Sequence, residues 1–210
     1  MTKSLRAELL IVLTLTFGIS GVRAVLNLIN SLAAPQRLDE QSVTLNSSQS
    51  SLAWVDMGLQ LCSAAVLFSY GALALFLLAK DRFVPRAHRA RDWLEGAGLA
   101  ALIGIPGLAL YFAAVHLGWS KEVIPGDFAN AWVEIPVSLL KAAANAFAEE
   151  TVVVMWLMTR LRQARWSLPA ALAASSILRG SYHLYQGVSA GFGNIIMGLI
   201  YGYYLSLIHI

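Results

Sequence analysis

Long apolar runs separated by short charged clusters are the feature that most limits how this chain can fold. Each run is long enough, or nearly so, for an α-helix to cross a hydrocarbon core of about 30 Å. The chain is 58% hydrophobic and 13% charged, whereas a soluble domain carries about 25% charged residues. We therefore predict an all-α, polytopic transmembrane helix bundle with about six membrane segments, at residues 9–32, 52–79, 96–117, 131–161, 169–186 and from 194 onward.

The positions of the basic residues predict how this bundle is oriented. Most Lys and Arg side chains lie near the N-terminus, in 80–91 and in 160–165. The polar segments 35–50 and 118–131 contain few of them. Basic loops stay in the cytoplasm, so we expect a cytoplasmic N-terminus and two external loops, in an integral protein of a bacterial plasma membrane. The net charge of +3 lies in short clusters rather than on one face, which argues against nucleic acid as a partner.

Several local features of the apolar runs also lead to expectations. Pro106 lies in the middle of the third run and should kink it. The glycine-rich segment 187–193 should form a turn before the sixth helix, in which Gly198 and Gly202 form a GxxxG packing face. Cys62, the single cysteine, has no partner for a disulfide and should be a small buried side chain.

The sequence Gly18-Ile-Ser-Gly21 resembles the GxSG serine motif of rhomboid proteases. Ser20 with a distant histidine is therefore one alternative site. Glycine and serine are common packing residues between membrane helices, and the rest of the rhomboid pattern is not apparent, so we favour a packing role. Arg23 in the same run should face the bundle interior or extend its guanidinium to the interface.

Two polar clusters stand out inside the apolar runs. Glu149 and Glu150 are adjacent in the fourth run, where an ionised side chain facing lipid costs roughly 2.5 kcal/mol or more. Arg179 and His183 are four residues apart in the fifth run and share one helix face. Both clusters lie well within the bilayer by helical rise, in adjacent antiparallel helices. We predict that they meet inside the bundle and build one polar site.

The chemistry of these side chains allows three interpretations. A carboxylate beside a histidine in a protected cavity can deprotonate a water molecule while the imidazole orients it or stabilises an oxyanion. Alternatively, the same residues form an ion-pair network that holds two helices together. Glu149, Glu150 and His183 are also candidate ligands for a divalent metal such as zinc, although the HExxH pattern of zinc proteases is absent.

Three stretches carry a resemblance to a known family: EETVVVMW at 149–156, RGSYHLYQG at 179–187 and GNIIMGLIYG at 193–202. They resemble the CAAX-protease and bacteriocin-processing (CPBP, or ABI) family of intramembrane proteases. The resemblance implies an endopeptidase fold in which Glu149 is the water-activating base, Glu150 its paired carboxylate and His183 the assisting histidine. It divides the chain into N-terminal transmembrane helices, 1–130, and a partial catalytic core, 131–204.

The chain departs from the motifs of that family at several positions. Val154 stands where EExxxR has arginine, and Arg179 stands at the phenylalanine position of FxxxH. We hypothesise that Arg179 replaces the missing charge across the helix interface. The third motif, HxxxN, is not visible: Asn194 has Ala190 four residues before it. Asn194 is therefore only an additional candidate for the site.

The last six residues, LSLIHI at 205–210, match a translation of the transposon-end adapter used to prepare sequencing libraries. We therefore expect the natural reading frame to continue beyond Tyr204. On this interpretation the chain is truncated at its C-terminus, the HxxxN helix lies beyond it, and the fragment as written is inactive.

The sequence as a whole predicts an intramembrane endopeptidase of the CAAX-processing type. Its substrate would be a peptide or protein, lipidated or not, that reaches the site from the surrounding membrane lipids. The alternative is a catalytically silent membrane scaffold, or a bacteriocin-immunity protein, with the same fold.

Overall fold

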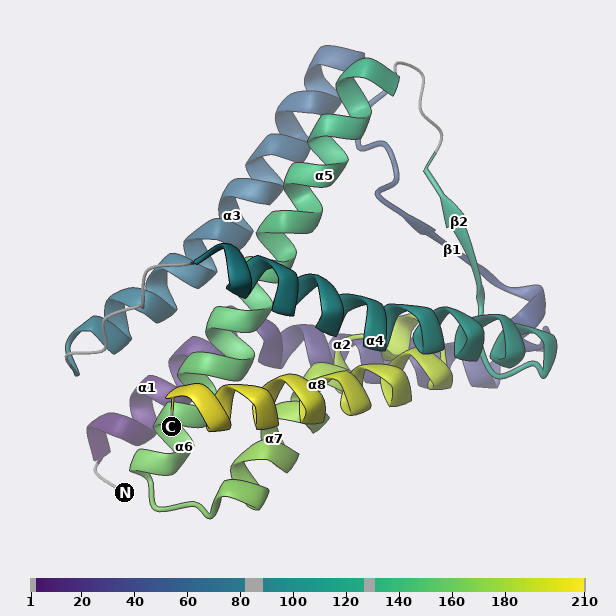
Figure 1. Ribbon diagram of the computed structural model, residues 1–210. Coiled ribbons are helices and arrows are strands. Elements are labelled where there is room, and N and C mark those ends of the chain that lie inside the picture. The colour runs from purple at the N-terminus through teal and green to yellow at the C-terminus, as the bar shows by residue number, and fades with distance from the viewer. Residues whose placement is uncertain (1–2, 82–88, 127–130, 210) are drawn as a thin grey trace.

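The computed structural model describes residues 3–81, 89–126 and 131–209, and this part of the chain is predominantly helical. The all-α prediction is confirmed. Figure 1 shows α3 and α5 side by side, α4 crossing α5, and α8 lower down across the continuation of α5. The helices are α1 Lys3–Leu15, α2 Phe17–Ala33, α3 Ala53–Ala79, α4 Ala90–His116, α5 Ala131–Ala148, α6 Leu157–Gln163, α7 Leu168–Ser181 and α8 Val188–His209.

The number of helices that can cross a membrane is lower than the six predicted. Among the described residues, α3, α4 and α8 are each long and apolar enough, and the pair α1–α2 would add a fourth if it counts as one bent span. The chain therefore has the helices of an integral membrane protein. The six-span count is not confirmed. The fourth predicted run changes to π-helical geometry between α5 and α6, and the fifth, α7, has only 14 residues.

The first predicted run is two helices rather than one. α1 and α2 meet at an angle of 52°, and the residue between them, Thr16, has non-helical backbone angles. The Thr16 hydroxyl donates a hydrogen bond to the Val12 carbonyl over 2.7 Å. Such back-bonding by threonine competes with the helical hydrogen bonds and bends helices.

The fourth predicted run is a continuous rod with an unusual centre. Between α5 and α6, residues Glu149–Trp156 form the π-helical segment η2, and π-helical turns in proteins are frequent at functional sites. The Ser175 hydroxyl of α7 donates to the Val153 carbonyl over 2.6 Å and so anchors η2 to α7. On the other side, Gly71 of α3 lies against Phe147 and Thr151, where a Cβ would collide with both side chains.

The two segments predicted as external loops contain a short parallel strand pair. β1, Ser42–Leu45, pairs with β2, Glu122–Pro125, and Ser42 lies opposite Glu122. Figure 1 shows that this pair connects the N-terminal ends of α3 and α5 with the ends of α2 and α4. The pairing places both segments at the same side of the bundle, as alternating spans require.

The start of α8 differs from the prediction. The helix begins at Val188 instead of Asn194, and only Gly187 of the glycine-rich segment lies in a turn, with a φ of +129°. The later glycines are helical because they allow close packing. Gly198 approaches Ser176, and Gly202 approaches Leu172, so the GxxxG packing face is confirmed.

Other local expectations have mixed outcomes. α4 continues through Pro106 as one element, and His88 of the basic loop lies outside the described residues. Cys62 is exposed rather than buried, because α3 turns Gln60 and Ala64 inward instead. Arg23 is also exposed, so the interpretation that it faces the bundle interior is wrong.

Candidate active site

Glu149, the first residue of η2, is the buried centre of the candidate site, and its side chain is 6% exposed. The Asn145 amide, one turn earlier on α5, donates to Glu149 Oε1 over 2.6 Å. Arg179 Nη2 lies 3.0 Å from Glu149 Oε2. Both carboxylate oxygens are thus held by side chains from two helices, which fixes the orientation of the group.

Arg179 connects the two acids from α7. Its Nη1 donates to Glu150 Oε1 over 2.7 Å while Nη2 faces Glu149. The guanidinium also lies over the Tyr201 ring of α8, 5.4 Å from its centroid. Arg179 is buried, whereas the Glu150 side chain is 41% exposed. The two adjacent acids therefore have different environments, one closed and one open.

His183 follows α7 and faces the same carboxylate. Its Nδ1 lies 3.0 Å from the Arg179 carbonyl oxygen. If that nitrogen carries the proton and donates it, Nε2 is left as an acceptor. Nε2 is 3.9 Å from Glu149 Oε1, which is too long for a hydrogen bond. A separation of this kind is one that a water molecule can bridge.

Tyr182 is a buried neighbour that the sequence did not single out. It is 7% exposed, and its ring centroid lies 4.8 Å from that of Phe17 and 4.7 Å from that of His183. Its hydroxyl interacts electrostatically with Glu149 but has no hydrogen-bond partner within the described part of the chain. Buried tyrosine hydroxyls usually have a partner, and the group beside this hydroxyl is the Glu149 carboxylate.

Comparison with known families finds one similarity. Residues 130–207 match the family model described as type II CAAX prenyl endopeptidase Rce1-like. This segment, less than half of the 210-residue chain, is similar to that family. No curated protein and no solved structure matches the chain. The Rce1-like segment contains the helices from α5 to α8, and with them Glu149, Glu150, Arg179 and His183.

The structure brings these four residues of the Rce1-like segment together, as predicted. Besides Tyr182, it reveals two more contributors that were missed, Asn145 and Tyr201. Asn145 carried a signal, because it is a polar residue four positions before Glu149 in an apolar helix. Tyr201 carried none, because only the packing of α8 against α7 places its ring over Arg179.

The remaining candidates do not join this group. The Asn194 amide donates to the Ala190 carbonyl over 2.9 Å, and in the described residues no hydrogen bond connects it to the acids. Ser20 is exposed on α2 and faces the Thr16 carbonyl at 3.4 Å. Gly21, in contrast, packs closely against Ser181, which agrees with the packing role expected for the GxSG glycines.

The arrangement of the acids does not fit a metal ion. Across residues 3–81, 89–126 and 131–209, no three His, Cys, Asp or Glu side chains are grouped so that they could hold one. The Arg179 guanidinium binds both Glu149 and Glu150, so a cation already compensates their charge. The candidate ligands are therefore satisfied by a protein group.

Proposed function

We propose that this chain is an intramembrane endopeptidase in which Glu149 activates a water molecule that hydrolyses a peptide bond. The observation that carries the proposal is the buried Glu149 carboxylate facing His183 Nε2 across 3.9 Å, within an Rce1-like segment. A general base must reach the proton that it removes, either directly or through one water. The gap between Oε1 and Nε2 offers such a position.

In the proposed reaction, the water oxygen attacks the carbonyl carbon of the substrate while Glu149 accepts one water proton. Glu149 then delivers that proton to the leaving nitrogen as the C–N bond breaks, which gives an amine and a carboxylic acid that keeps the second water hydrogen. His183 Nε2 accepts a hydrogen bond from the second water hydrogen and so orients the nucleophile. The charge on the carbonyl oxygen needs fixed donors, and the unpartnered Tyr182 hydroxyl and Arg179 Nε are suitable groups.

Arg179 is proposed to replace the arginine that the EExxxR motif would place at position 154. Val154 is buried and uncharged. Because η2 is π-helical, residues five apart lie one turn apart, so a side chain at 154 projects from the same face as Glu149. Arg179 supplies a guanidinium to that acid from the neighbouring helix.

The proposed substrate is a membrane-associated peptide or protein. The family description names prenyl endopeptidases, so a lipidated C-terminal peptide is the first substrate class to test. We further propose that the protein lies in a bacterial plasma membrane with its N-terminus in the cytoplasm, because the basic loops favour that orientation. The proposed mechanism uses only protein side chains and water.

One observation favours a second candidate function, a silent scaffold or immunity protein. Arg179 joins η2 to α7 through both acids, which is what a purely structural ion-pair network would do. In that case removing Glu149 would weaken the fold and leave no enzymatic activity to lose.

Cleavage of a prenylated peptide by purified, membrane-inserted variants of the complete gene product tests the proposed function. Glu149→Ala and His183→Ala should each reduce cleavage by about 10²–10⁴-fold, the range that a general base contributes, without reducing membrane insertion. His116→Ala is the matched control, because His116 is exposed on α4 and outside the site. Retained cleavage in Glu149→Ala, or impaired insertion with no cleavage in the unsubstituted protein, would overturn the proposal.

A further inference from the structure

A polar stripe runs along one face of α5 and continues onto the first residue of η2. Its members are spaced by three or four residues, which places them on one side of a helix. Leu139 and Leu140, between them in sequence, are exposed large apolar residues instead. Polar side chains facing lipid are costly, so the stripe needs an environment other than hydrocarbon. Its members are Glu134, Ser138, Lys141, Asn145 and Glu149.

α3 provides the opposite wall of this stripe. Gln60 is buried at 7% exposure and accepts a hydrogen bond from Lys141 Nζ over 2.7 Å. Its own amide donates to the Ser47 carbonyl over 3.2 Å. The charge of Lys141 is thus solvated by α3 rather than by lipid, and the polar contacts continue into the segment after β1.

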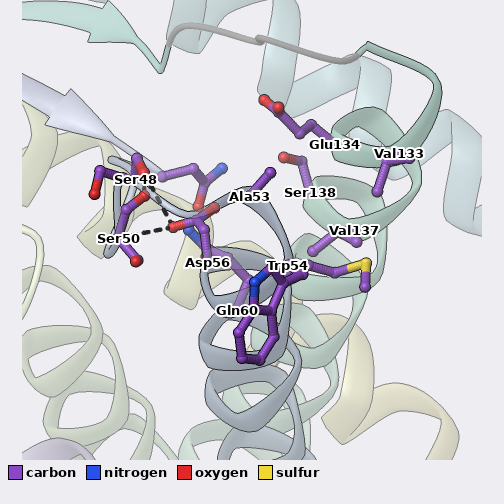
Figure 2. A pocket seen from close by; sticks show the side chains of 13 residues that line it. Ser48, Ser50, Ala53, Trp54, Asp56, Gln60, Val133, Glu134, Val137 and Ser138 are labelled. Atoms are coloured by element: carbon purple, nitrogen blue, oxygen red, sulfur yellow. Dashed lines mark hydrogen bonds between the residues drawn. The ribbon is translucent and has the colours of Figure 1, made fainter.

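The stripe opens into a cavity at the end of the bundle that carries the strand pair. This cavity of about 440 Å³ lies between the first turns of α3 and α5, as Figure 2 shows. Glu134 and Ser138 line one wall and Asp56 the other, where Asp56 accepts hydrogen bonds from Ser48 Oγ and the Ser50 amide. At about 30 Å³ per molecule, it has room for on the order of ten waters.

The opposite end of the stripe is the candidate base. Asn145 follows Lys141 by one turn and donates to Glu149 Oε1 over 2.6 Å. The same oxygen faces His183 Nε2. Polar groups are therefore present at each turn of α5 from the cavity to the atom at which the proposed reaction begins.

We propose that this stripe is a hydration route, with the cavity of Figure 2 as its aqueous mouth. Hydrolysis consumes one water for each bond cleaved, and a base buried among apolar helices needs a supply of it. Gln60, Lys141 and Asn145 give a moving water successive hydrogen-bond partners. The need for water at Glu149 rests on the proposed function. The hydration of the stripe rests only on its polar side chains and on the cavity.

Cysteine accessibility tests the route independently of activity. In a Cys62→Ser background, Lys141→Cys and Asn145→Cys are compared with Ala142→Cys and Ala146→Cys, which lie at matched depths on the exposed side of α5. The probe is a membrane-impermeant methanethiosulfonate that carries a trimethylammonium group, applied to protein in vesicles. Because only the hydrated thiolate reacts, the stripe positions should be labelled at least about tenfold faster. Equal rates within each pair would overturn the route.

A bulky substitution in the cavity wall gives a second test of the route. Ser138→Trp fills the cavity wall, whereas Leu139→Trp places the same side chain on the exposed face. Only Ser138→Trp should slow the labelling of Asn145→Cys, and it should slow cleavage by the otherwise unsubstituted protein. No difference between the two tryptophan variants would overturn the route.

The outcomes of these tests separate the route from the proposed function. Fast labelling of the stripe together with unchanged cleavage in Glu149→Ala would keep the route and reject the proposed function. Slow labelling of the stripe together with loss of cleavage in Glu149→Ala would reject the route and keep the proposed function.

Discussion

Two arginines in this molecule each bind two carboxylates, and their surroundings differ. Arg160 of α6 binds Glu8 over 2.6 Å and also binds Asp81, and its Nη2 donates to the Leu77 carbonyl. Arg179 binds Glu149 and Glu150 at 3.0 and 2.7 Å.

The acids bound by Arg160 come from α1 and from the end of α3, so this arginine connects three segments that are distant in sequence. Every nitrogen of its guanidinium has a partner. Arg179 binds two acids of a single helix, its Nε has no partner within the described residues, and an imidazole lies nearby. An arginine with two carboxylates therefore forms a structural ion-pair network at Arg160, here called the clamp, and a candidate active site at Arg179. The difference lies in which donors remain available.

The largest effect on stability is expected when the clamp is broken. Arg160→Ala leaves Glu8 without its ion pair and removes a side chain that is 5% exposed. Breaking a fully buried pair costs about 3–5 kcal/mol. Glu8 and Asp81 are 24% and 40% exposed, so we expect a smaller decrease, of about 1–3 kcal/mol, in the free energy of unfolding, measured in detergent. Arg162→Ala, at an exposed position of the same helix, should change it by less than about 0.5 kcal/mol. Normal stability with lost cleavage in Arg160→Ala would contradict the clamp.

The next effect concerns activity and the missing motif arginine. Arg179→Ala should reduce kcat on the order of 10²-fold, because Glu149 loses the group that orients it and small misplacements have costs of that size. Adding Val154→Arg should restore much of the rate, since that side chain projects from the same face of η2. Steady-state cleavage by both variants checks this prediction. A double variant as slow as Arg179→Ala alone would reject the replacement of one arginine by the other.

A smaller effect is expected from the unpartnered hydroxyl of Tyr182. Tyr182→Phe should lower kcat about tenfold, less than the 10²–10³ of a sole oxyanion donor, because Arg179 Nε remains. Stability should not fall, since the change removes an unsatisfied buried group. Tyr70→Phe is the control, because Tyr70 also packs against Phe17. If both variants keep full activity, the hydroxyl has no role in catalysis.

The smallest effect is a pH dependence at the clamp. The hydrogen bond from Arg160 holds the pKa of Asp81 below its ordinary value of 3.8. Such a carboxyl stabilises the fold above its unfolded pKa and loses this contribution as pH falls through the lower folded pKa. Stability should thus decrease below pH 3.8, and Asp81→Asn should decrease less over the same range. The difference is small because the side chain is 40% exposed. If the unsubstituted protein and Asp81→Asn show the same change in thermal midpoint with pH, the predicted pH dependence is wrong.

The sequence predicted features that depend on local patterns. α3 begins one residue after the predicted start and ends at the predicted residue, and the polar clusters at Glu149 and Arg179 meet because helical rise places both at similar depth. The bend at Thr16, the π-helical turn and the strand pair were not predicted. The π-helical turn and the strand pair depend on contacts between segments distant in sequence, such as Ser175 with the Val153 carbonyl. The bend at Thr16 is local, because the Thr16 hydroxyl bonds the Val12 carbonyl. Glycines after Gly187 suggested a turn, yet they serve close helix packing in α8.

One pair of isosteric substitutions tests the central claim, that Glu149 activates water whereas Glu8 only supports the fold. Cleavage rate and thermal midpoint would be measured for Glu149→Gln and Glu8→Gln in the same membrane preparation. We predict that Glu149→Gln loses about 10²–10⁴-fold in kcat while it stays folded and membrane-inserted, because Arg179 keeps its pair with Glu150, and that Glu8→Gln keeps its kcat with a lower midpoint. Full cleavage by Glu149→Gln would contradict the account.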